Sequence, residues 1–240
     1  MKRRIAIMAF AVILALGMYV PASFGYSVEA GDWIRFEDSY GTLTGEMEVW
    51  ASDTHYGTYS YMYNTFCLEI YETMDYYDPP WYPSYYVNDV SGSAIKGGQD
   101  DGNATPNSDP ISVGTAFLYY NFYMGTLENY NFTDAALRTA SADALQRAIW
   151  YLEDEISDPG SNIFLTAVIS QFGSIENAQL DNNIYSVAAV NITTQWYGTT
   201  YYNQSTLIAE EMVVTPEPMT VSLLGLGILG LGLMRRRMHR

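Results

Sequence analysis

The chain has few of the residues that most often carry catalysis or covalent cross-links. Among its 240 residues there is one cysteine, Cys67, and there are two histidines. A single cysteine excludes an internal disulfide. A cysteine protease needs a histidine, and outside the basic C-terminal end the chain offers only His55, where the sequence favours a turn or strand edge. Acidic pairs such as Asp100 and Asp101 follow from composition and indicate no glycosidase. We therefore expect a protein that is not an enzyme.

Positive charge is also scarce between the two ends of the chain. Lysine and arginine total 11, against 27 aspartates and glutamates. Seven of the basic residues stand in segments 1–4 and 235–240, and all the acids lie between these segments. The basic residues that remain there are Arg35, Lys96, Arg138 and Arg147. Such an acidic surface repels nucleic acid and anionic lipid, so we expect no nucleic-acid partner.

The chain contains no apolar run of ordinary membrane-spanning length, but it has a short one at each end. Residues 5–18 are apolar, follow a basic start and precede small residues, which predicts a cleaved signal peptide over 1–25. Residues 219–234 are apolar and glycine-rich, and glycine is tolerated in lipid, so they predict a short transmembrane helix. Arg235, Arg236 and Arg237 would hold that end in the cytoplasm by the positive-inside rule. Both ends thus place the segment between them outside.

The C-terminal segment 215–240 carries a specific resemblance. Pro216, Glu217 and Pro218 precede the apolar run, and the three arginines follow it. This order resembles the PEP-CTERM protein-sorting tail of Gram-negative and related bacteria. In that family an exosortase, a membrane transpeptidase-like protease, recognises the tail and cuts near Pro-Glu-Pro, and the host typically makes extracellular polysaccharide. The resemblance implies the export machinery, an exosortase-type protease and, transiently, the inner membrane as partners. It implies a membrane-anchored precursor and then a mature protein at the cell envelope, cell surface or extracellular matrix.

Residues 26–214 are expected to form a β-rich ectodomain. Tyrosine, threonine and glycine are frequent in it, which favours strands and turns. The sequence predicts strands within 33–36, 45–50, 59–70, 85–90, 186–196 and 205–214, and helices over 115–124, 163–172 and a segment capped by Thr133 or Ser141 that ends near Glu155. A strand block, a helical insertion and a final strand pair indicate an α+β fold, an antiparallel sheet or sandwich with helices inserted.

The loop 97–110 is polar, and its oxygen-bearing side chains are those that calcium prefers. Asp100, Asp101, Asn103 and Asp109 do not have the spacing of an EF-hand. We therefore expect no metal site and no cofactor.

Two further segments together contain residues that could react with each other. The first is Thr65-Phe66-Cys67-Leu68-Glu69, and the second runs from Ala144 to Glu153 and contains Gln146-Arg147-Ala148-Ile149-Trp150. An aromatic-Cys-apolar block followed by Gln-x-Ala-Ile-Trp resembles the thioester domains of bacterial surface adhesins. In that family the cysteine sulfur condenses with the glutamine side chain and expels ammonia. A lysine or another nucleophile on a target then attacks the thioester and becomes covalently attached.

The resemblance implies a thioester between Cys67 and Gln146, with Phe66, Ile149 and Trp150 around it. Helical spacing places Gln146 beside Ile149 and Trp150, and large apolar neighbours would screen the bond from water. The chain departs from the family at Leu145, where the adhesins usually carry threonine, and it lacks a clear counterpart of their middle apolar-Gln-polar block. The expected function is covalent attachment to an exopolysaccharide or surface-protein target. The alternative is a structural or matrix-binding protein in which Cys67 is a small buried hydrophobic residue.

Overall fold

The computed structural model describes residues 27–38, 45–70, 84–95, 109–196 and 199–210. The chain divides into two units, Met1–Glu210 and Glu211–Arg240, and every element below belongs to the first. The predicted signal peptide 1–25 and sorting tail 215–240 lie outside the described residues. Within the described ranges, no helix combines the length and the apolar character needed to cross a membrane.

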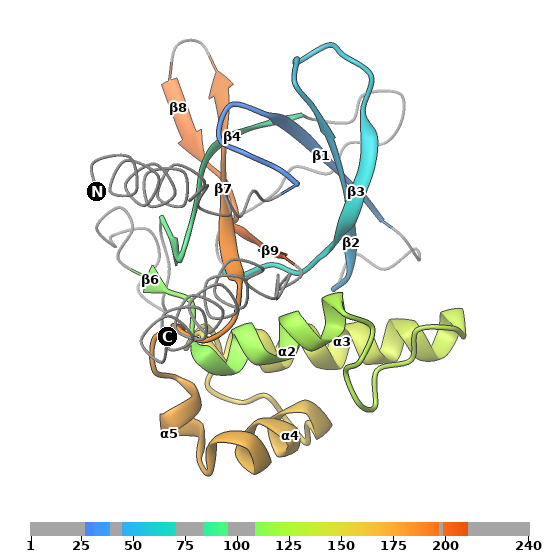
Figure 1. Ribbon diagram of the computed structural model, residues 1–240, viewed down its shortest axis with the longest axis vertical. Helices are drawn as coiled ribbons and strands as arrows, with labels where there is room; N and C mark the ends of the chain where they lie inside the picture. Colours follow the sequence, from blue (N-terminus) through green and yellow to red (C-terminus); the bar gives the residue numbers. More distant parts are fainter. Residues whose placement is uncertain (1–26, 39–44, 71–83, 96–108, 197–198, 211–240) are drawn as a thin grey trace, which may run out of the picture. The chain divides into compact units, whose positions relative to one another are not determined.

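Seven strands form one antiparallel sheet (Figure 1). Its order is β3-β2-β1-β4-β7-β8, and β9 also pairs with β7. The strands are β1 (Trp33–Asp38), β2 (Met47–Ser52), β3 (Ser60–Thr65), β4 (Tyr85–Ser91), β7 (Val187–Trp196), β8 (Thr199–Tyr202) and β9 (Thr206–Ala209). Two short strands, β5 (Ser93–Ala94) and β6 (Asp109–Pro110), form a separate ribbon. The chain is therefore α+β with an antiparallel sheet, as the sequence predicts, and the seven strands form a single sheet rather than a sandwich.

The sheet curls until the chain beyond β3 meets β9. The Leu68 N–H donates to the Ser205 carbonyl at 2.9 Å, and the Leu207 N–H donates to the Phe66 carbonyl at 3.2 Å. Cys67 faces Thr206 between these two bonds as an isolated antiparallel bridge. This second partner for β9 joins the two ends of the strand order β3-β2-β1-β4-β7-β9.

Successive side chains of the strands point to opposite faces of the sheet, and this separates the core into two clusters. The sheet-side cluster fills the inside of the curled sheet; it comprises Val28, Ile34, Phe36, Met47, Val49, Tyr63, Cys67, Tyr85, Val87, Ala188, Val190, Ile192 and Ile208. The helix-side cluster lies between the sheet and the helices; among its members are Phe66, Leu68, Tyr119, Phe122, Leu145, Ile149, Phe164, Ala189 and Leu207. Neighbouring residues in the 66–68 segment, β7 and β9 therefore point into different clusters, and these segments are apolar on both faces, as expected for strands covered on both sides.

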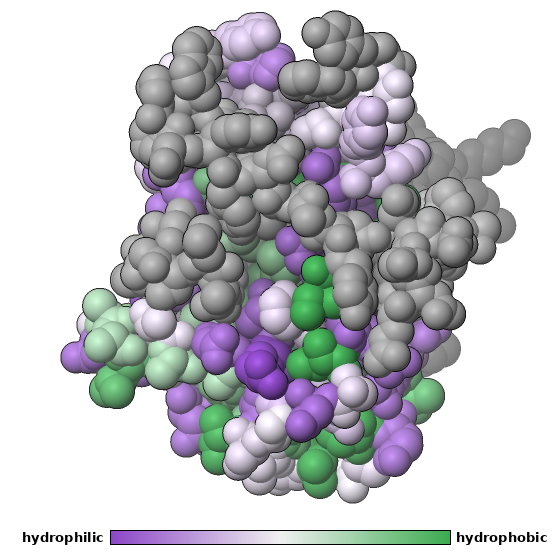
Figure 2. Space-filling view, turned by 180° about the vertical axis from the view of Figure 1, so that it is seen from behind, coloured by the Kyte–Doolittle hydropathy of each residue, from purple (hydrophilic) through white to green (hydrophobic). Residues whose placement is uncertain are grey.

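Four helices are described, α2 (Val113–Tyr123), α3 (Ala135–Leu152), α4 (Ile163–Phe172) and α5 (Ile175–Ala178). Figure 1 shows α2 and α3 across one end of the curled sheet, with α4 and α5 farther from it. The helix α3 is long and has its N-cap at Asp134, whose side chain accepts from the Leu137 N–H. On the face drawn in Figure 2, polar and apolar residues are interspersed over the helical region, and scattered exposed apolar side chains of this kind are normal.

Several boundaries differ from the sequence prediction. The cap of α3 is Asp134 rather than Thr133 or Ser141, because Asn131 accepts from the N–H groups of Thr133 and Asp134 and turns the chain into the helix. The helix ends at Leu152 rather than near Glu155, since Asp154 adopts a positive φ of 61°. Strand β3 ends at Thr65 rather than near Ile70, and strand β8 was not predicted from the sequence.

Candidate functional site

Cys67 lies where the end of the curled sheet meets α3. Its segment, from Phe66 to Leu68, is hydrogen-bonded to β9 along one edge. In an antiparallel pair, the backbone groups of successive residues point alternately toward and away from the partner strand. The Phe66 carbonyl and the Leu68 N–H point toward β9, so the N–H and the carbonyl of Cys67 point away from it. The backbone polar groups of Cys67 therefore need partners on the side away from β9.

Gln146 supplies both partners. It is 1% exposed and lies on the buried face of α3, together with Ala142, Leu145 and Ile149. The Cys67 N–H donates to Gln146 Oε1 at 2.9 Å, and Gln146 Nε2 donates to the Cys67 carbonyl at 2.8 Å. The carboxamide thus pairs with the backbone of Cys67 as another strand would. The two residues are 79 positions apart in the sequence, and the fold brings them into direct contact.

The same helix holds the segment at a second point. Beyond the end of α3, the Glu155 carboxylate accepts from the Ile70 N–H at 3.0 Å. Glu155 is 2% exposed, so this bond is shielded from water. Bonds to β9 on one edge and to α3 and its C-terminal turn on the other fix the backbone around Cys67. A backbone held in this way presents the cysteine side chain in one orientation, which is the preorganisation that a reaction between neighbouring groups requires.

The environment of the thiol keeps it protonated. Cys67 is 8% exposed. Burial, and secondarily the negative charge of Glu69, raises the pKa of the Cys67 thiol far above its usual range. Because the thiolate is the reactive form, a thiol with so high a pKa reacts slowly with reagents from solution. Any reaction at Cys67 therefore depends on a partner that is already in place.

The three residues predicted to surround the pair are buried or partly buried in the two core clusters. Phe66 is buried in the helix-side cluster and makes an edge-to-face contact with Phe122, with ring centroids 4.9 Å apart. Ile149 is fully buried in the same cluster. Trp150, partly buried, packs against the sheet-side cluster that contains Cys67. Phe66 and Ile149 thus belong to the helix-side cluster, whereas Trp150 packs against the cluster that contains Cys67.

A buried ionic group that the sequence did not predict holds the start of α3 to the sheet. Glu46, 1% exposed, accepts from Arg138 Nε at 2.8 Å and from the Tyr130 hydroxyl at 2.7 Å. Arg138 also forms the salt bridge to the other carboxylate oxygen, at 2.5 Å. Asn64, at the end of β3, donates to that oxygen at 2.5 Å. The pairing of Arg138 with Glu46 has one signal in the sequence, the scarcity of basic residues between the two ends of the chain. A buried acid there has few possible cationic partners.

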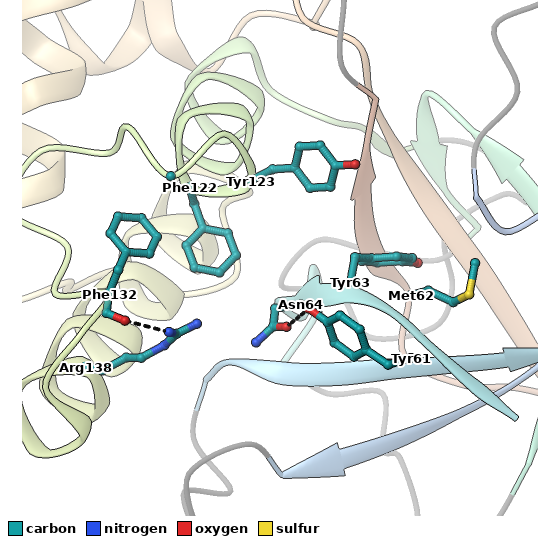
Figure 3. Close-up of a pocket in the computed structure, with 9 residues that line it drawn as sticks. Tyr61, Met62, Tyr63, Asn64, Phe122, Tyr123, Phe132 and Arg138 are labelled. Atoms are coloured by element: carbon teal, nitrogen blue, oxygen red, sulfur yellow. Dashed lines mark hydrogen bonds between the residues drawn. The ribbon is translucent and has the colours of Figure 1, made fainter.

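A pocket of about 240 Å³ opens beside this ionic group. Figure 3 shows the aromatic side chains of Tyr61, Tyr63, Phe122, Tyr123 and Phe132 around it. Its polar lining residues are Asn64 and Arg138. Tyr63 also belongs to the sheet-side cluster, so one wall of the pocket is continuous with the packing around Cys67. Apolar walls with a few fixed polar groups are typical of small-ligand sites.

The remaining predicted residues fall into two groups. Pro216, Glu217, Pro218 and the arginines 235–237 lie outside the described residues, as do Asp100, Asp101 and Asn103. His55 is described and lies in a turn, where it stacks on Trp33 with ring centroids 3.9 Å apart. Among the described residues, no group of three or more histidine, cysteine or acidic side chains is arranged to hold a metal ion.

Comparison of the chain with protein-family models, with curated proteins and with solved structures gives no match.

Proposed function

We propose that this protein is an exported surface or matrix protein that attaches covalently to its target through a thioester between Cys67 and Gln146. The observation that carries the proposal is the pairing of the Gln146 carboxamide with the backbone of Cys67, at 2.9 and 2.8 Å. It holds the amide carbon next to the residue that bears the thiol, in a site that excludes water. Cys67 is the sole cysteine among the described residues, and Gln146 is the glutamine that the resemblance to the adhesins implies as its partner.

The reaction is balanced without a cofactor. Cys67 Sγ attacks Gln146 Cδ, the C–S bond forms, and the C–N bond breaks. The thiol proton passes to the departing nitrogen, which leaves as ammonia. In the second step an amine on the target attacks Cδ, an amide forms, the C–S bond breaks and the Cys67 thiol is restored. The Cys67 N–H donates to Oε1 before the reaction, which polarises the amide carbonyl as the thiol approaches.

The thioester is tested by the mass of the full-length chain, purified in mild detergent and digested under acidic conditions. A peptide pair joined at Cys67 and Gln146, lighter than the sum of its parts by one ammonia, is expected. Methylamine should open the bond, add one methylamine at Gln146 and release one thiol. Cys67→Ala and Gln146→Glu should abolish both results. Unmodified Gln146 and a full complement of free thiol in the untreated chain would refute the thioester.

The tail supports the proposal for export. Residues 215–240 combine Pro-Glu-Pro, an apolar run and a basic end, and we propose that an exosortase-type protease processes them after the export machinery has inserted the chain in the inner membrane. Fractionation of a producing cell should recover a protein shortened at both ends in the envelope or the surrounding matrix. Recovery of the full-length chain in the cytosol would contradict this part of the proposal.

The pocket beside Glu46 favours a second candidate function, non-covalent binding of a matrix saccharide. Its tyrosine and phenylalanine rings offer faces on which a sugar ring can stack, and Asn64 and Arg138 offer polar groups at its edge. In this alternative Gln146 has a structural role and Cys67 stays a free buried thiol. Non-covalent binding would be supported if the Gln146→Glu variant, which forms no thioester, still binds oligosaccharides. The binding should be lost when Tyr61→Ala is added.

A further inference from the structure

Thr206 has a buried hydroxyl that the packing of the protein does not explain. The residue is fully buried, and its Oγ1 makes no hydrogen bond within the described part of the chain. The large majority of buried side-chain polar atoms in folded proteins have a partner, so an exception requires a reason. Thr65, close to it across the same strand pair, shows the usual arrangement, because its hydroxyl donates to the Leu207 carbonyl at 2.6 Å.

The position of Thr206 relates this hydroxyl to the proposed thioester. Thr206 is the residue opposite Cys67 across the antiparallel bridge. The flanking bonds, from Leu68 to Ser205 and from Leu207 to Phe66, make this a non-hydrogen-bonded pair, the kind in which opposed side chains lie closest. Their Cβ atoms are then about 4.5–5.5 Å apart and on one face of the strands.

Packing identifies the same face independently. Cys67 belongs to the sheet-side cluster, and so does Ile208, two residues beyond Thr206. Residues two apart on a strand point to the same side. A second buried donor without a partner in the described ranges, Trp150 Nε1, belongs to a side chain packed against this cluster. The Thr206 hydroxyl thus lies on the side to which the Cys67 side chain points, and Trp150 packs against the cluster on that side.

We infer that the Thr206 hydroxyl is a catalytic hydrogen-bond donor to the carbonyl oxygen of the Cys67–Gln146 bond, and this inference rests on the proposed function. The Gln146 amide now lies at the edge of the strand, on the Cys67 backbone. For the C–S bond to form, Gln146 Cδ must move onto the face that carries Sγ, which is the face of Thr206. Its oxygen then lies on the side of the Thr206 hydroxyl, which donates to it as the negative charge develops.

The inference is tested on the full-length chain by Thr206→Val, which keeps the shape of the side chain and removes the hydroxyl. Loss of one donor to an oxyanion typically slows a reaction about 100-fold, so methylamine should open the thioester about that much more slowly. Thr206→Ser should restore the rate. Thr193→Val is the matched control, since Thr193 is a buried threonine on β7, and it should react as the wild type does.

A purely structural role predicts a different result. A hydroxyl without a partner contributes nothing to folding, so Thr206→Val would then be as stable as the wild type or more so, and would react at the wild-type rate. Opening by methylamine at the wild-type rate in this variant would overturn the inference and leave the proposed function intact. Absence of the thioester from the wild-type chain would instead refute the proposed function. Should Thr206→Val fail to fold, Thr206→Ala gives the same comparison against Thr206→Ser.

Discussion

A thioester between Cys67 and Gln146 would make the chain a closed loop, and its effect on stability can be worked out from their separation. The two residues are 79 positions apart. In the chain-entropy treatment of cross-links, closing a loop of that length removes freedom from the unfolded chain worth about 4–5 kcal/mol. Cys67→Ala removes the cross-link, and the packing of one sulfur atom adds about 1 kcal/mol. We therefore expect this variant to lose roughly 5–6 kcal/mol of unfolding free energy by these two principles.

Methylamine provides a control that removes the cross-link without removing the Cys67 side chain. It opens the bond, restores the Cys67 thiol and leaves a methylamide at Gln146, so the opened wild type should lose about 4–5 kcal/mol, the entropic part alone. Urea unfolding of the full-length chain in mild detergent, at a mildly acidic pH that preserves the thioester, measures all three forms. If Cys67 is a free buried residue instead, Cys67→Ala should cost only about 1 kcal/mol. Closed and methylamine-opened chains that unfold at the same urea concentration would refute the cross-link reasoning.

Three further outcomes follow from the buried polar groups. In the Cys67→Ala chain, which has no cross-link, a further Gln146→Leu change should lower the unfolding free energy by about 2–6 kcal/mol in urea titrations, because two buried backbone groups lose their partners and each costs about 1–3 kcal/mol; a loss below 1 kcal/mol would contradict the hydrogen-bonding role. Arg138→Met leaves the buried Glu46 carboxylate without its cation and should cost about 3–5 kcal/mol, measured in the same way, and a neutral result would show that the pair is not closed in solution. Burial raises the pKa of Glu153 to about 7 from its ordinary value of 4.5, so between these pH values the folded protein keeps a proton that the unfolded chain has lost. The unfolding free energy should therefore fall by about 3 kcal/mol between pH 4.5 and 7. Glu153→Gln should flatten this dependence, the exposed Asp143→Asn should not, and equal slopes in both variants would exclude Glu153 as the source.

The secondary structure was largely predictable because local patterns dominate it. The helix over 163–172 is bounded by an asparagine cap and by Gly173 in the left-handed conformation, and both signals are legible in the sequence. The cap of α3 was missed by one residue, since Asn131, Thr133 and Asp134 are all capping residues, and only their side-chain contacts decide among them. The short strand β8 has every residue exposed, so it carries no pattern of burial from which it could be predicted.

The sequence by itself determined the composition of the candidate site, and the two ends of the chain predict its topology. One cysteine, one glutamine in a helical segment with Ile149 and Trp150 beside it, and two short apolar runs flanked by basic residues are all properties of the linear chain. Local propensity and residue chemistry are sufficient to identify them.

Only the tertiary structure decided how these residues meet. The contact of Cys67 with Gln146, the pairing of Cys67 with Thr206 and the enclosure of Glu46 by Arg138 and Tyr130 all join residues far apart in the sequence. Their physical cause is the closure of the curled sheet against α3, which leaves the backbone groups of one residue to be satisfied by a side chain. No periodicity within a single segment encodes that closure, because it depends on where separate segments pack.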